Sequence, residues 1–496
     1  MTRPMVFALG FAIAILMLTA AGLWAWSSHD LLLATPSHQR VLTATYHSTC
    51  LDASAGIKPV WECYQLPVAN ARQQFEIVHA SGRRHRVSGF NIDHKNYIRF
   101  TPDLPGRWCY HPLAENFDAP ESEEPCITID DQHPDYARGF VAANHQKWIR
   151  TADGKAFIPQ YLMYDKPDLA AGLDLFITDH GFSGFNIVNL RDFLRNPGYF
   201  EAVVLETYRR GGVTHFWIWG DASRKLTPEF YPGNVDELYQ AICARLGPLP
   251  GWTANYGFDL YEWATEEEIL ALQESWQSCT SYRHLLGARG YKNTYKSISD
   301  QLDFASWEWH RPNLEDYRQH LVHAGDKPAF SEDRFRIRDS VRHANKDYTE
   351  PMTLRGLWHA LFSGGVANIW GKQDDDGEFS AAYELKTGMR FYRQVVDQYY
   401  RMETTPVAFE GLDICLRNSD SILCLLEESN AVSWQPLAAK LKEESSAVAD
   451  IEAYDIWQCC KPLLFTSTGG DPQLKRSSDW VVIFHLMTTS EEAPVN

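Results

Sequence analysis

The sequence predicts a multidomain chain in which a central (β/α)8 TIM barrel is flanked by an N-terminal and a C-terminal β-sandwich. Three observations predict this arrangement. The 496 residues correspond to about three domains at roughly 150 residues each. Strand-like runs alternate with helical runs between residues 138 and 402, as in a parallel sheet with crossover helices. Both flanks instead alternate apolar and polar residues in short runs separated by turn residues, which is typical of antiparallel sheets.

Residues 1–30 predict an export segment. Arg3 precedes a mainly apolar stretch at residues 5–26, and polar residues follow at 27–30. Small residues near Thr19 and Ala21 would allow cleavage, but at about 20 residues the stretch is also long enough to remain as an uncleaved anchor. We therefore expect an exported protein, periplasmic, cell-surface or secreted, with a possible membrane tether through this segment.

The first domain is expected at residues 36–137. The run Tyr97-Ile98-Arg99-Phe100 leads into a turn at residues 102–106, and Trp108-Cys109-Tyr110 resumes the alternation. This pattern predicts a β-hairpin within a small antiparallel sandwich.

The barrel is expected at residues 138–402. Its eight candidate strands are residues 157–163, 184–190, 215–219, 253–260, 284–288, 304–307, 327–331 and 366–370. Thr265 and Glu268 predict a capping box at the start of one helix. Leu354, Leu357, Trp358 and Leu361 share one face of another helix, which Gly364-Gly365 should end.

The last domain is expected at residues 403–496. Strand-like runs at residues 411–415, 421–426 and 480–486 are separated by polar turns. These runs predict the second β-sandwich.

Ten cysteines favour an oxidising compartment, because six of them lie in pairs that are close in sequence. The pairs are Cys50 with Cys63, Cys109 with Cys126, and Cys415 with Cys424. We expect these to be structural disulfides. The adjacent Cys459 and Cys460 do not have the spacing of a zinc site, and no metal is expected.

The formal net charge is −18, from 64 acidic and 46 basic residues. Such a field repels phosphate backbones and anionic lipid, so nucleic acid is not an expected partner. Aromatic residues make up 13% of the chain, and their flat faces suit the pyranose rings of a carbohydrate as well as they suit a protein core.

Polar side chains at the C-terminal ends of the barrel strands converge on one face, so they are the best functional candidates. The expected substrate-binding residues are Asp165, Arg191, Trp219, Asp221, Arg289, Trp307, Glu308, His310, Arg334 and Trp370. The expected catalytic residues are Glu332, Asp259 and Glu262.

Cleavage of a glycosidic bond needs one carboxyl group that protonates the leaving oxygen and a second that attacks the anomeric carbon or activates water. Strands seven and four can place two such groups on opposite sides of one cleft. Glu332 would be the nucleophile, and Asp259 the acid, with Glu262 as its rival. Alternatively these acids pair with the arginines of residues 334–338, and the same arginines could hold an acidic sugar.

Other enzyme motifs are missing from the sequence. It contains no G-x-S-x-G elbow, P-loop, H-E-x-x-H helix or glycine-rich dinucleotide turn. Esterase, kinase, zinc-protease and dehydrogenase functions are therefore disfavoured, and no cofactor is expected.

Several short motifs resemble the clan A glycoside hydrolases of the apiosidase-like group. The motifs are residues 97–102 with Gly106-Arg107-Trp108, Gly184-Phe185-Asn186, Gly257-Phe258-Asp259, Lys327-Pro328 ahead of Glu332, and Trp358 with Gly364-Gly365. The resemblance covers nearly all of the chain after the export segment. It implies an immunoglobulin-like domain before the barrel and a small β-sandwich, called a collagen-binding domain in that group, after it.

The resemblance also implies retaining hydrolysis, with the nucleophile on strand seven at Glu332 and the acid/base at the end of strand four. Clan A enzymes usually carry Asn-Glu at the latter place, whereas this chain is expected to carry Phe258-Asp259. Either Asp259 substitutes, or Glu262 takes over, or activity is lost. Retaining and inverting outcomes both remain open, because a shorter acid widens the gap between the carboxyl groups.

Two other functions remain as alternatives. A catalytically inactive carbohydrate-binding or scaffold protein would keep the barrel for recognition and would explain the missing Asn-Glu. A polysaccharide lyase acting on uronate-containing glycans would use the arginines to neutralise a carboxylate.

Overall fold

The computed structural model describes most of the chain from Cys50 to Thr488. The described residues are 50–54, 56–113, 125–163, 173–179, 181–187, 189–190, 192–219, 235–258, 260, 263–291, 301–308, 313–322, 324–335, 350–372, 383–401, 405–409, 412–427, 439–441, 443, 446–457, 462–466, 474 and 479–488. The predicted export segment, residues 1–30, lies outside them. No helix in the described part is long and apolar enough to cross a membrane.

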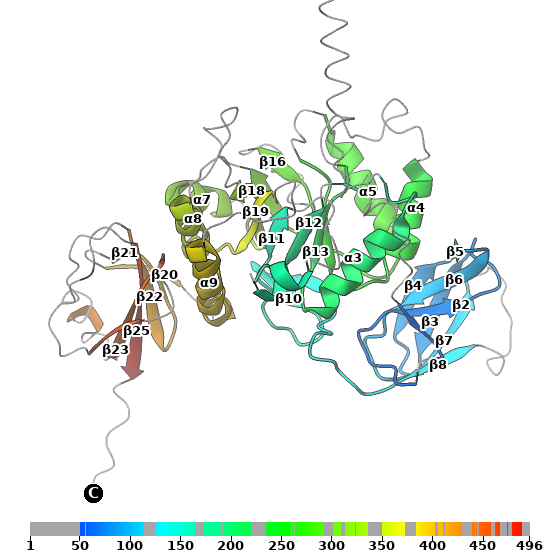
Figure 1. The fold of residues 1–496 in the computed structure, drawn as a ribbon, viewed down its shortest axis with the longest axis horizontal. Helices are drawn as coiled ribbons and strands as arrows, with labels where there is room; N and C mark the ends of the chain where they lie inside the picture. Colours follow the sequence, from blue (N-terminus) through cyan, green and yellow to red (C-terminus); the bar gives the residue numbers. More distant parts are fainter. Residues whose placement is uncertain are drawn as a thin grey trace, which may run out of the picture. The chain divides into compact units, whose positions relative to one another are not determined.

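The N-terminal domain is built from two four-stranded sheets (Figure 1). One sheet has the order β1 (Leu51–Asp52), β2 (Tyr64–Pro67), β6 (Lys95–Phe100), β5 (Phe90–Ile92). The other has the order β4 (Arg84–Ser88), β3 (Gln74–His79), β7 (Gly106–Pro112), β8 (Cys126–Ile129). The alternation of apolar residues buries one face of each sheet, and Ile77, Ile98 and Trp108 are fully buried in the shared core. The predicted sandwich is confirmed.

A nine-stranded parallel sheet forms the barrel. Its strands are β11 (Gln160–Met163), β12 (Gly184–Ile187), β13 (Thr214–Trp217), β14 (Trp252–Asn255), β15 (Leu286–Gly287), β16 (Arg289–Tyr291), β17 (Ala305–Glu308), β18 (Ala329–Phe335) and β19 (Ala367–Lys372). β15 and β16 are the two halves of a fifth strand interrupted at Ala288, and they are the two ends of the sheet order. The eight predicted strands and the barrel are therefore confirmed.

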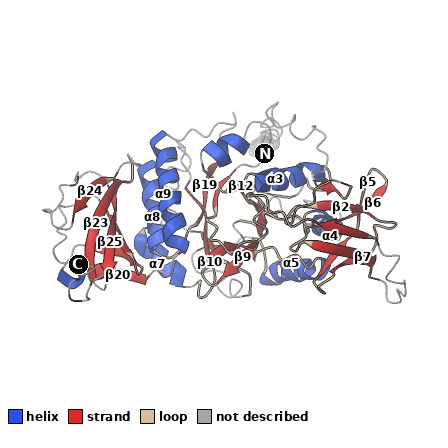
Figure 2. Cartoon of the chain, turned by 90° about the horizontal axis from the view of Figure 1, so that it is seen from below, coloured by secondary structure: helices blue, strands red, loops and turns tan. Residues whose placement is uncertain are grey.

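Helices cover the outside of the barrel (Figure 1). They are α3 (Pro197–Arg209), α4 (Val235–Arg245), α5 (Glu266–Cys279), α7 (Leu314–Val322), α8 (Glu350–Phe362) and α9 (Tyr383–Arg401), with a π-helix η2 at Asp174–Asp179. Thr265 and Glu268 form the predicted capping box of α5. The four predicted apolar residues of α8 are buried, and Gly364 follows the helix with φ of 91°. Figure 2 shows α7, α8 and α9 side by side.

The N-terminal end of the barrel is closed by an antiparallel hairpin, β9 (Val141–Asn144) and β10 (Lys147–Arg150). The ring of Trp148 on β10 is buried, and its centroid lies 5.0 Å from that of Phe304 and 5.9 Å from that of Phe330. Above them the imidazole of His215 is stacked on Tyr161 at 5.3 Å. This aromatic stack fills the lower interior, so the barrel is a packed core.

The described C-terminal strands form one six-stranded antiparallel sheet. Its order is β20 (Thr405–Phe409), β21 (Leu412–Arg417), β22 (Ser421–Leu426), β25 (Trp480–Thr488), β23 (Ser446–Asp455), β24 (Leu463–Thr466). Polar contacts join the sheet to α8. Arg355 Nε lies 2.8 Å from the carboxylate oxygen Oδ2 of Asp479, and His359 Nε2 forms a hydrogen bond with the Glu427 carboxylate. The pairing confirms an antiparallel β domain after the barrel.

The three predicted disulfides, Cys50–Cys63, Cys109–Cys126 and Cys415–Cys424, are all present. A fourth, Cys243–Cys279, joins α4 to α5 and was not predicted, because its cysteines are 36 residues apart. Cys459 and Cys460 lie outside the described residues. Four disulfides favour an oxidising, extracytoplasmic location.

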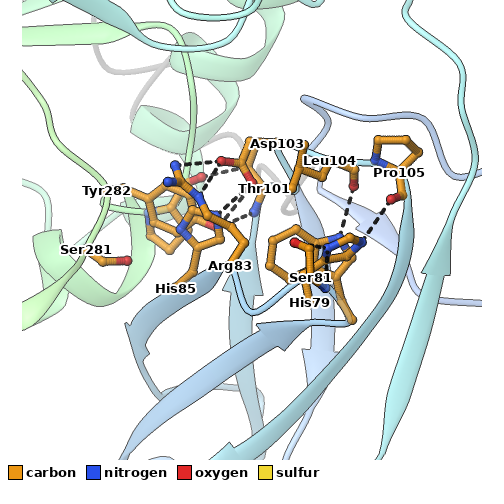
Figure 3. Close-up of polar contacts among 12 residues, drawn as sticks. His79, Ser81, Arg83, His85, Thr101, Asp103, Leu104, Pro105, Ser281 and Tyr282 are labelled. Carbon is orange, nitrogen blue, oxygen red and sulfur yellow. Dashed lines mark hydrogen bonds and ion pairs between the residues drawn. The ribbon is translucent and has the colours of Figure 1, made fainter.

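A polar interface holds the N-terminal domain against the barrel. Asp103 accepts hydrogen bonds from Arg83 at 2.9 Å and His85 at 3.0 Å, and the hydroxyl of Tyr282 bonds the backbone of Thr101, as Figure 3 shows. The His85 and Tyr282 rings are stacked at 4.6 Å. The pKa of Asp103 is lowered, because the hydrogen bond and charge of His85 together with Arg83 outweigh the effect of burial.

A buried ion triad adds to this interface. Glu201 on α3 accepts a hydrogen bond from Arg99 on β6 at 2.8 Å and a second from Arg245 at the end of α4. Glu201 and Arg99 are fully buried, and both guanidinium groups lie over the Phe90 ring. The single carboxylate is shared by two guanidinium groups, so the triad joins the two domains and carries one net positive charge.

Candidate active site at the barrel mouth

Residues from four neighbouring barrel strands form a polar and aromatic cluster. Trp217 ends β13, Asn255 ends β14, Arg289 begins β16, and Ser306 lies within β17. Register pairs Trp217 with Asn255 and Arg289 with Ser306, and the Asn255 side chain connects the two pairs. Paired positions in a sheet share one face. We call Trp217, Asn255, Arg289 and Ser306, together with Phe258, the mouth cluster.

Asn255 is the centre of the mouth cluster. Its side chain is fully buried, its Oδ1 accepts the backbone N–H of Arg289 at 3.0 Å, and its Nδ2 donates to Ser306 Oγ at 3.1 Å. The carboxamide therefore bridges the interruption between the two halves of the fifth strand. A residue with both a donor and an acceptor is needed for these two bonds.

The guanidinium group of Arg289 lies over two neighbouring aromatic rings. Its Cζ is 5.1 Å from the centroid of Trp217 and 5.3 Å from that of Phe258, and the two rings are 4.9 Å apart. Arg289 is 1% exposed. These cation–π contacts fix both the charge and the segment that carries Phe258.

The loop after β14 is held on both sides of position 259. The indole N–H of Trp263 donates to the backbone carbonyl of Phe258 at 2.9 Å. The backbone N–H of Ala264 donates to the backbone carbonyl of Leu260 at 2.9 Å. Leu260 is fully buried. Asp259 itself lies outside the described residues; of its two neighbours, Phe258 belongs to the mouth cluster and Leu260 is buried.

Strand four ends earlier than expected. The predicted strand covered residues 253–260, whereas β14 is Trp252–Asn255 and Phe258 lies in the following loop. The pair at the end of the strand is therefore Asn255-Tyr256, and the expected placement of Phe258-Asp259 there was wrong. Apolar residues continue past Asn255 because the loop is buried, which made the strand look longer.

Tyr256 is bonded to side chains outside the mouth cluster. Its hydroxyl and that of Tyr239 on α4 hydrogen bond with the indole of Trp219, and burial raises the pKa of both phenols. The Trp219 and Tyr239 rings lie 5.5 Å apart. Tyr256 is therefore part of the packing between barrel and helices and stays protonated at neutral pH.

Two tryptophans predicted to bind substrate have the contacts of core residues. Trp219 is 2% exposed and packs on Tyr239, whereas Trp307 is 6% exposed and packs edge-on against Tyr317 of α7 at 5.3 Å. Trp307 also belongs to a cluster with Ala360 of α8. Both rings face the helical layer, so we leave them out of the proposed substrate site.

The remaining predicted residues have these positions. Glu308 ends β17, Glu332 and Arg334 lie in β18, and Trp370 lies in β19, but only their backbones are described. Asp165, Arg191, Asp221, Asp259, Glu262 and His310 lie outside the described residues. Register in β18 shifts between Ser331 and Phe335, so Glu332 follows the last regularly paired residue of that strand. This irregularity is common where a strand redirects a side chain near a site.

Sequence reasoning did not single out Asn255, Ser306 or Trp217. A signal existed for Asn255: it is a carboxamide within a mainly apolar segment, residues 252–258. Ser306 and Trp217 had no such signal, because their importance follows from register between strands that are distant in sequence. In the described part of the chain, no three His, Cys, Asp or Glu side chains are grouped to hold a metal ion.

The fold and the mouth cluster define a TIM-barrel protein with an aromatic, polar C-terminal face. A candidate glycoside hydrolase from Bacteroides vulgatus matches 87% of this chain and 100% of its own, with a TM-score of 0.64 and 12% identity. A structure described as a glycoside hydrolase matches 72% of this chain and 98% of its own, with a TM-score of 0.52 and 10% identity. At such identities the likeness shows the shared fold. No protein-family model and no curated protein matches the chain.

Proposed function

We propose that this chain is an exported glycoside hydrolase that cleaves a polysaccharide or oligosaccharide with two carboxylates at the barrel mouth. The mouth cluster carries the proposal. It holds Phe258, the residue before Asp259, against Arg289 and Trp217. Glycoside hydrolysis needs fixed acids in such a place, on opposite sides of the scissile bond.

Glu332 is the proposed nucleophile. It lies two residues after Phe330, whose ring packs on His215 inside the barrel at 4.9 Å. Position 332 lies at the register shift of β18, and such irregularities commonly redirect a side chain near a site. In a retaining mechanism its carboxylate would attack the anomeric carbon and form a glycosyl-enzyme intermediate.

Asp259 is the proposed acid/base, and Glu262 is its rival. The acid would protonate the leaving oxygen and then take a proton from the water that hydrolyses the intermediate. The residue before Asp259, Phe258, is held by Arg289, whose Cζ lies 5.3 Å from the Phe258 ring centroid.

One observation favours a second function, binding of carbohydrate without cleavage. Clan A enzymes carry an acid at the place where this chain has Tyr256, and Tyr256 is buried against Trp219 and Tyr239. A barrel that lost this acid would keep the mouth cluster as a recognition surface. Asp259 and Glu262 decide between the two functions, because only a second carboxyl group permits hydrolysis.

The test is incubation of the purified full chain with bacterial and plant polysaccharides, both neutral and uronate-containing, followed by mass spectrometry of the products. Fragments that have gained one water support hydrolysis. Unsaturated ends would indicate a lyase, and binding without fragments would indicate a scaffold. Cleavage of uronate-containing glycans in preference to neutral ones would support a role for Arg334 in holding an acidic sugar.

Three isosteric variants assign the roles. Glu332→Gln should abolish cleavage, by several orders of magnitude in kcat/KM, without changing the thermal midpoint. Asp259→Asn and Glu262→Gln should differ, and the larger loss identifies the acid. Glu274→Gln, an exposed residue of α5, is the matched control and should keep full activity. Full activity in Glu332→Gln would refute the assignment of the nucleophile.

A further inference from the structure

A small cavity lies at the N-terminal ends of the first two barrel strands, β11 and β12. Its volume is about 150 Å³, and its walls come from the end of β10, the segments that lead into β11 and β12, the turn after α3, and α9. No residue of the mouth cluster lines it, so it is a separate site. The cavity is smaller than the sites that usually hold organic molecules, and its size suits an ion of a few atoms.

The charges in the wall of this cavity are mainly positive. Among the described residues that line it, the charged ones are Arg138, Arg150, Arg210, Arg393 and a single acid, Asp397. Arg210 is already paired, because its guanidinium group lies 2.7 Å from Asp174 and 3.1 Å from Glu206. Three cations therefore remain against one carboxylate, in a chain whose formal net charge is −18. A local surplus of positive charge attracts anions that the chain as a whole repels.

Arg150 is the most deeply buried of these cations, with an exposed fraction of 1%. Its Cζ lies 4.6 Å from the Phe157 ring centroid, and its Nη2 donates to the backbone carbonyls of Gly211 at 2.8 Å and Gly212 at 3.0 Å. These contacts fix the guanidinium group but supply no negative charge. No carboxylate of the described residues forms an ion pair with Arg150. A buried charge without a counter-ion destabilises a folded chain, and an anion in the adjoining cavity would compensate it.

The pKa of Arg150 reflects this environment. Burial lowers its pKa to about 10, and the like charge of Arg138 acts in the same direction. The two guanidinium groups are therefore near enough to repel each other. A bound anion would turn this repulsion into two attractions.

Arg138 and Arg393 keep hydrogen-bond donors that the described residues do not use. The Arg138 side chain makes one hydrogen bond, from Nε to the carbonyl of Asp135 at 3.4 Å, and the Arg393 side chain makes one from Nη1 to the carbonyl of Gly181. A guanidinium group has five N–H donors, so several remain on each residue for a ligand. Their planar, forked arrangement matches the oxygen atoms of phosphate and similar oxyanions.

We propose that this cavity binds a tetrahedral oxyanion, phosphate or sulfate, beside Arg138, Arg150 and Arg393. Arg138 and Arg393 donate to its oxygen atoms, and its negative charge compensates the buried charge of Arg150. The bound anion connects the hairpin β9–β10 to α9 at the closed end of the barrel and so stabilises the folded chain. This site is independent of the chemistry proposed for the barrel mouth.

The test is titration calorimetry of the full chain with inorganic phosphate and inorganic sulfate, and with acetate and chloride for comparison. Low-millimolar concentrations at constant ionic strength keep the general stabilising effect of such salts small. Arg138→Gln removes an exposed cation from the cavity wall, and Arg138→Lys keeps the charge without the planar group. Arg195→Gln is the matched control, because Arg195 is also exposed, pairs with Asp192 at 3.4 Å and does not line the cavity.

We expect phosphate and sulfate to bind the wild type roughly tenfold more tightly than acetate or chloride, and to raise its thermal midpoint. Arg138→Gln should raise the dissociation constant for phosphate about tenfold, Arg138→Lys should raise it less, and Arg195→Gln should leave it unchanged. The thermal midpoints of the variants without added anion show that they are folded. The proposal is overturned when neither oxyanion binds the wild type, when acetate or chloride binds as tightly as phosphate, or when Arg138→Gln binds phosphate as tightly as the wild type.

Discussion

The carboxamide of Asn255 accepts the backbone N–H of Arg289 at 3.0 Å, across the interruption of the fifth barrel strand at Ala288. The same side chain donates to Ser306 on the next strand. One buried residue thus connects three strands at the barrel mouth. The geometry of the proposed active site depends on it, since Arg289 in turn holds Phe258.

Asn255→Ala should lower both stability and activity. The substitution leaves the Arg289 N–H and the Ser306 hydroxyl without this partner in a buried place, which costs about 2 to 4 kcal/mol. Urea unfolding would measure the loss, and kcat/KM should fall with it. Asn91→Ala is the control, because Asn91 also donates to one side chain, Asn96, and accepts one backbone N–H, that of His94, but at an exposed position. An Asn255→Ala protein as stable as wild type would contradict the bridging role.

Trp307→Phe should destabilise the chain without changing substrate affinity. The indole packs against Tyr317 of α7 in the helical layer, and a smaller ring leaves a gap that costs about 1 to 3 kcal/mol. Thermal unfolding and KM are the two measurements. A higher KM at unchanged stability would instead return Trp307 to the substrate site.

Glu201→Gln should be strongly destabilising. The change removes the anion between Arg99 and Arg245 and leaves two buried cations without their partner, at about 3 to 5 kcal/mol. Glu206→Gln on the same helix is the control, because Glu206 is partly exposed and should contribute less than about 1 kcal/mol.

The same triad makes stability depend on pH. Burial opposes ionisation of Glu201, but Arg99 and Arg245 outweigh it, so its pKa is below the ordinary 4.5. A carboxylate with a depressed pKa stabilises the folded chain above its unfolded pKa, and this contribution is lost as the pH falls through the folded value. Urea midpoints measured on acidification below about pH 4.5 should fall less steeply in Glu201→Gln than in wild type.

Two buried histidines predict a separate loss of stability at mildly acidic pH. Burial lowers the pKa of His215 to about 3 and that of His284 to about 4, from an ordinary 6.5. Between pH 6.5 and the folded pKa of each histidine, the unfolded chain binds a proton that the folded chain does not. The free energy of unfolding therefore falls as the pH drops through this range. From about pH 7 to pH 5 each should cost about 2 kcal/mol.

His284→Gln tests the histidine prediction. Glutamine can still donate to the Gly247 carbonyl, which accepts from His284 at 2.6 Å. The slope of the free energy of unfolding with pH, measured by urea unfolding, should decrease by an amount that corresponds to about one proton. His145→Gln serves as the control, because His145 is largely exposed. An unchanged slope in His284→Gln would mean that this histidine is already protonated in the folded chain.

Removal of the disulfide between α4 and α5 should lower the thermal midpoint. Cys243 and Cys279 enclose 36 residues, and a loop of that size is worth about 3 to 4 kcal/mol. The double variant to Ala, compared with wild type under reducing and oxidising conditions, would measure this. Reduction of the Cys243–Cys279 bond should lower the thermal midpoint of the wild type only. Identical midpoints of the wild type and the double variant under oxidising conditions would show that this disulfide does not stabilise the chain.

Local pattern was enough to predict the eight barrel strands, the capping box at Thr265 and three of the disulfides. Each depends on residues that are near one another in the sequence. The fourth disulfide, Cys243–Cys279, depends on the packing of two helices and had no local signal. The end of strand four was misplaced for a related reason: the buried loop after Asn255 is as apolar as the strand itself.

The sequence by itself determined the fold class, because strand and helix periodicities are properties of neighbouring residues. It also marked Arg289 and Phe258, which the structure then placed together. Only the tertiary structure decided that Trp219 and Trp307 face the helices, that Asn255 bridges three strands, and that Arg150 lines a separate cavity. The reason is physical: which side of a strand a side chain occupies, and what it meets there, follows from register between segments that are far apart in the chain.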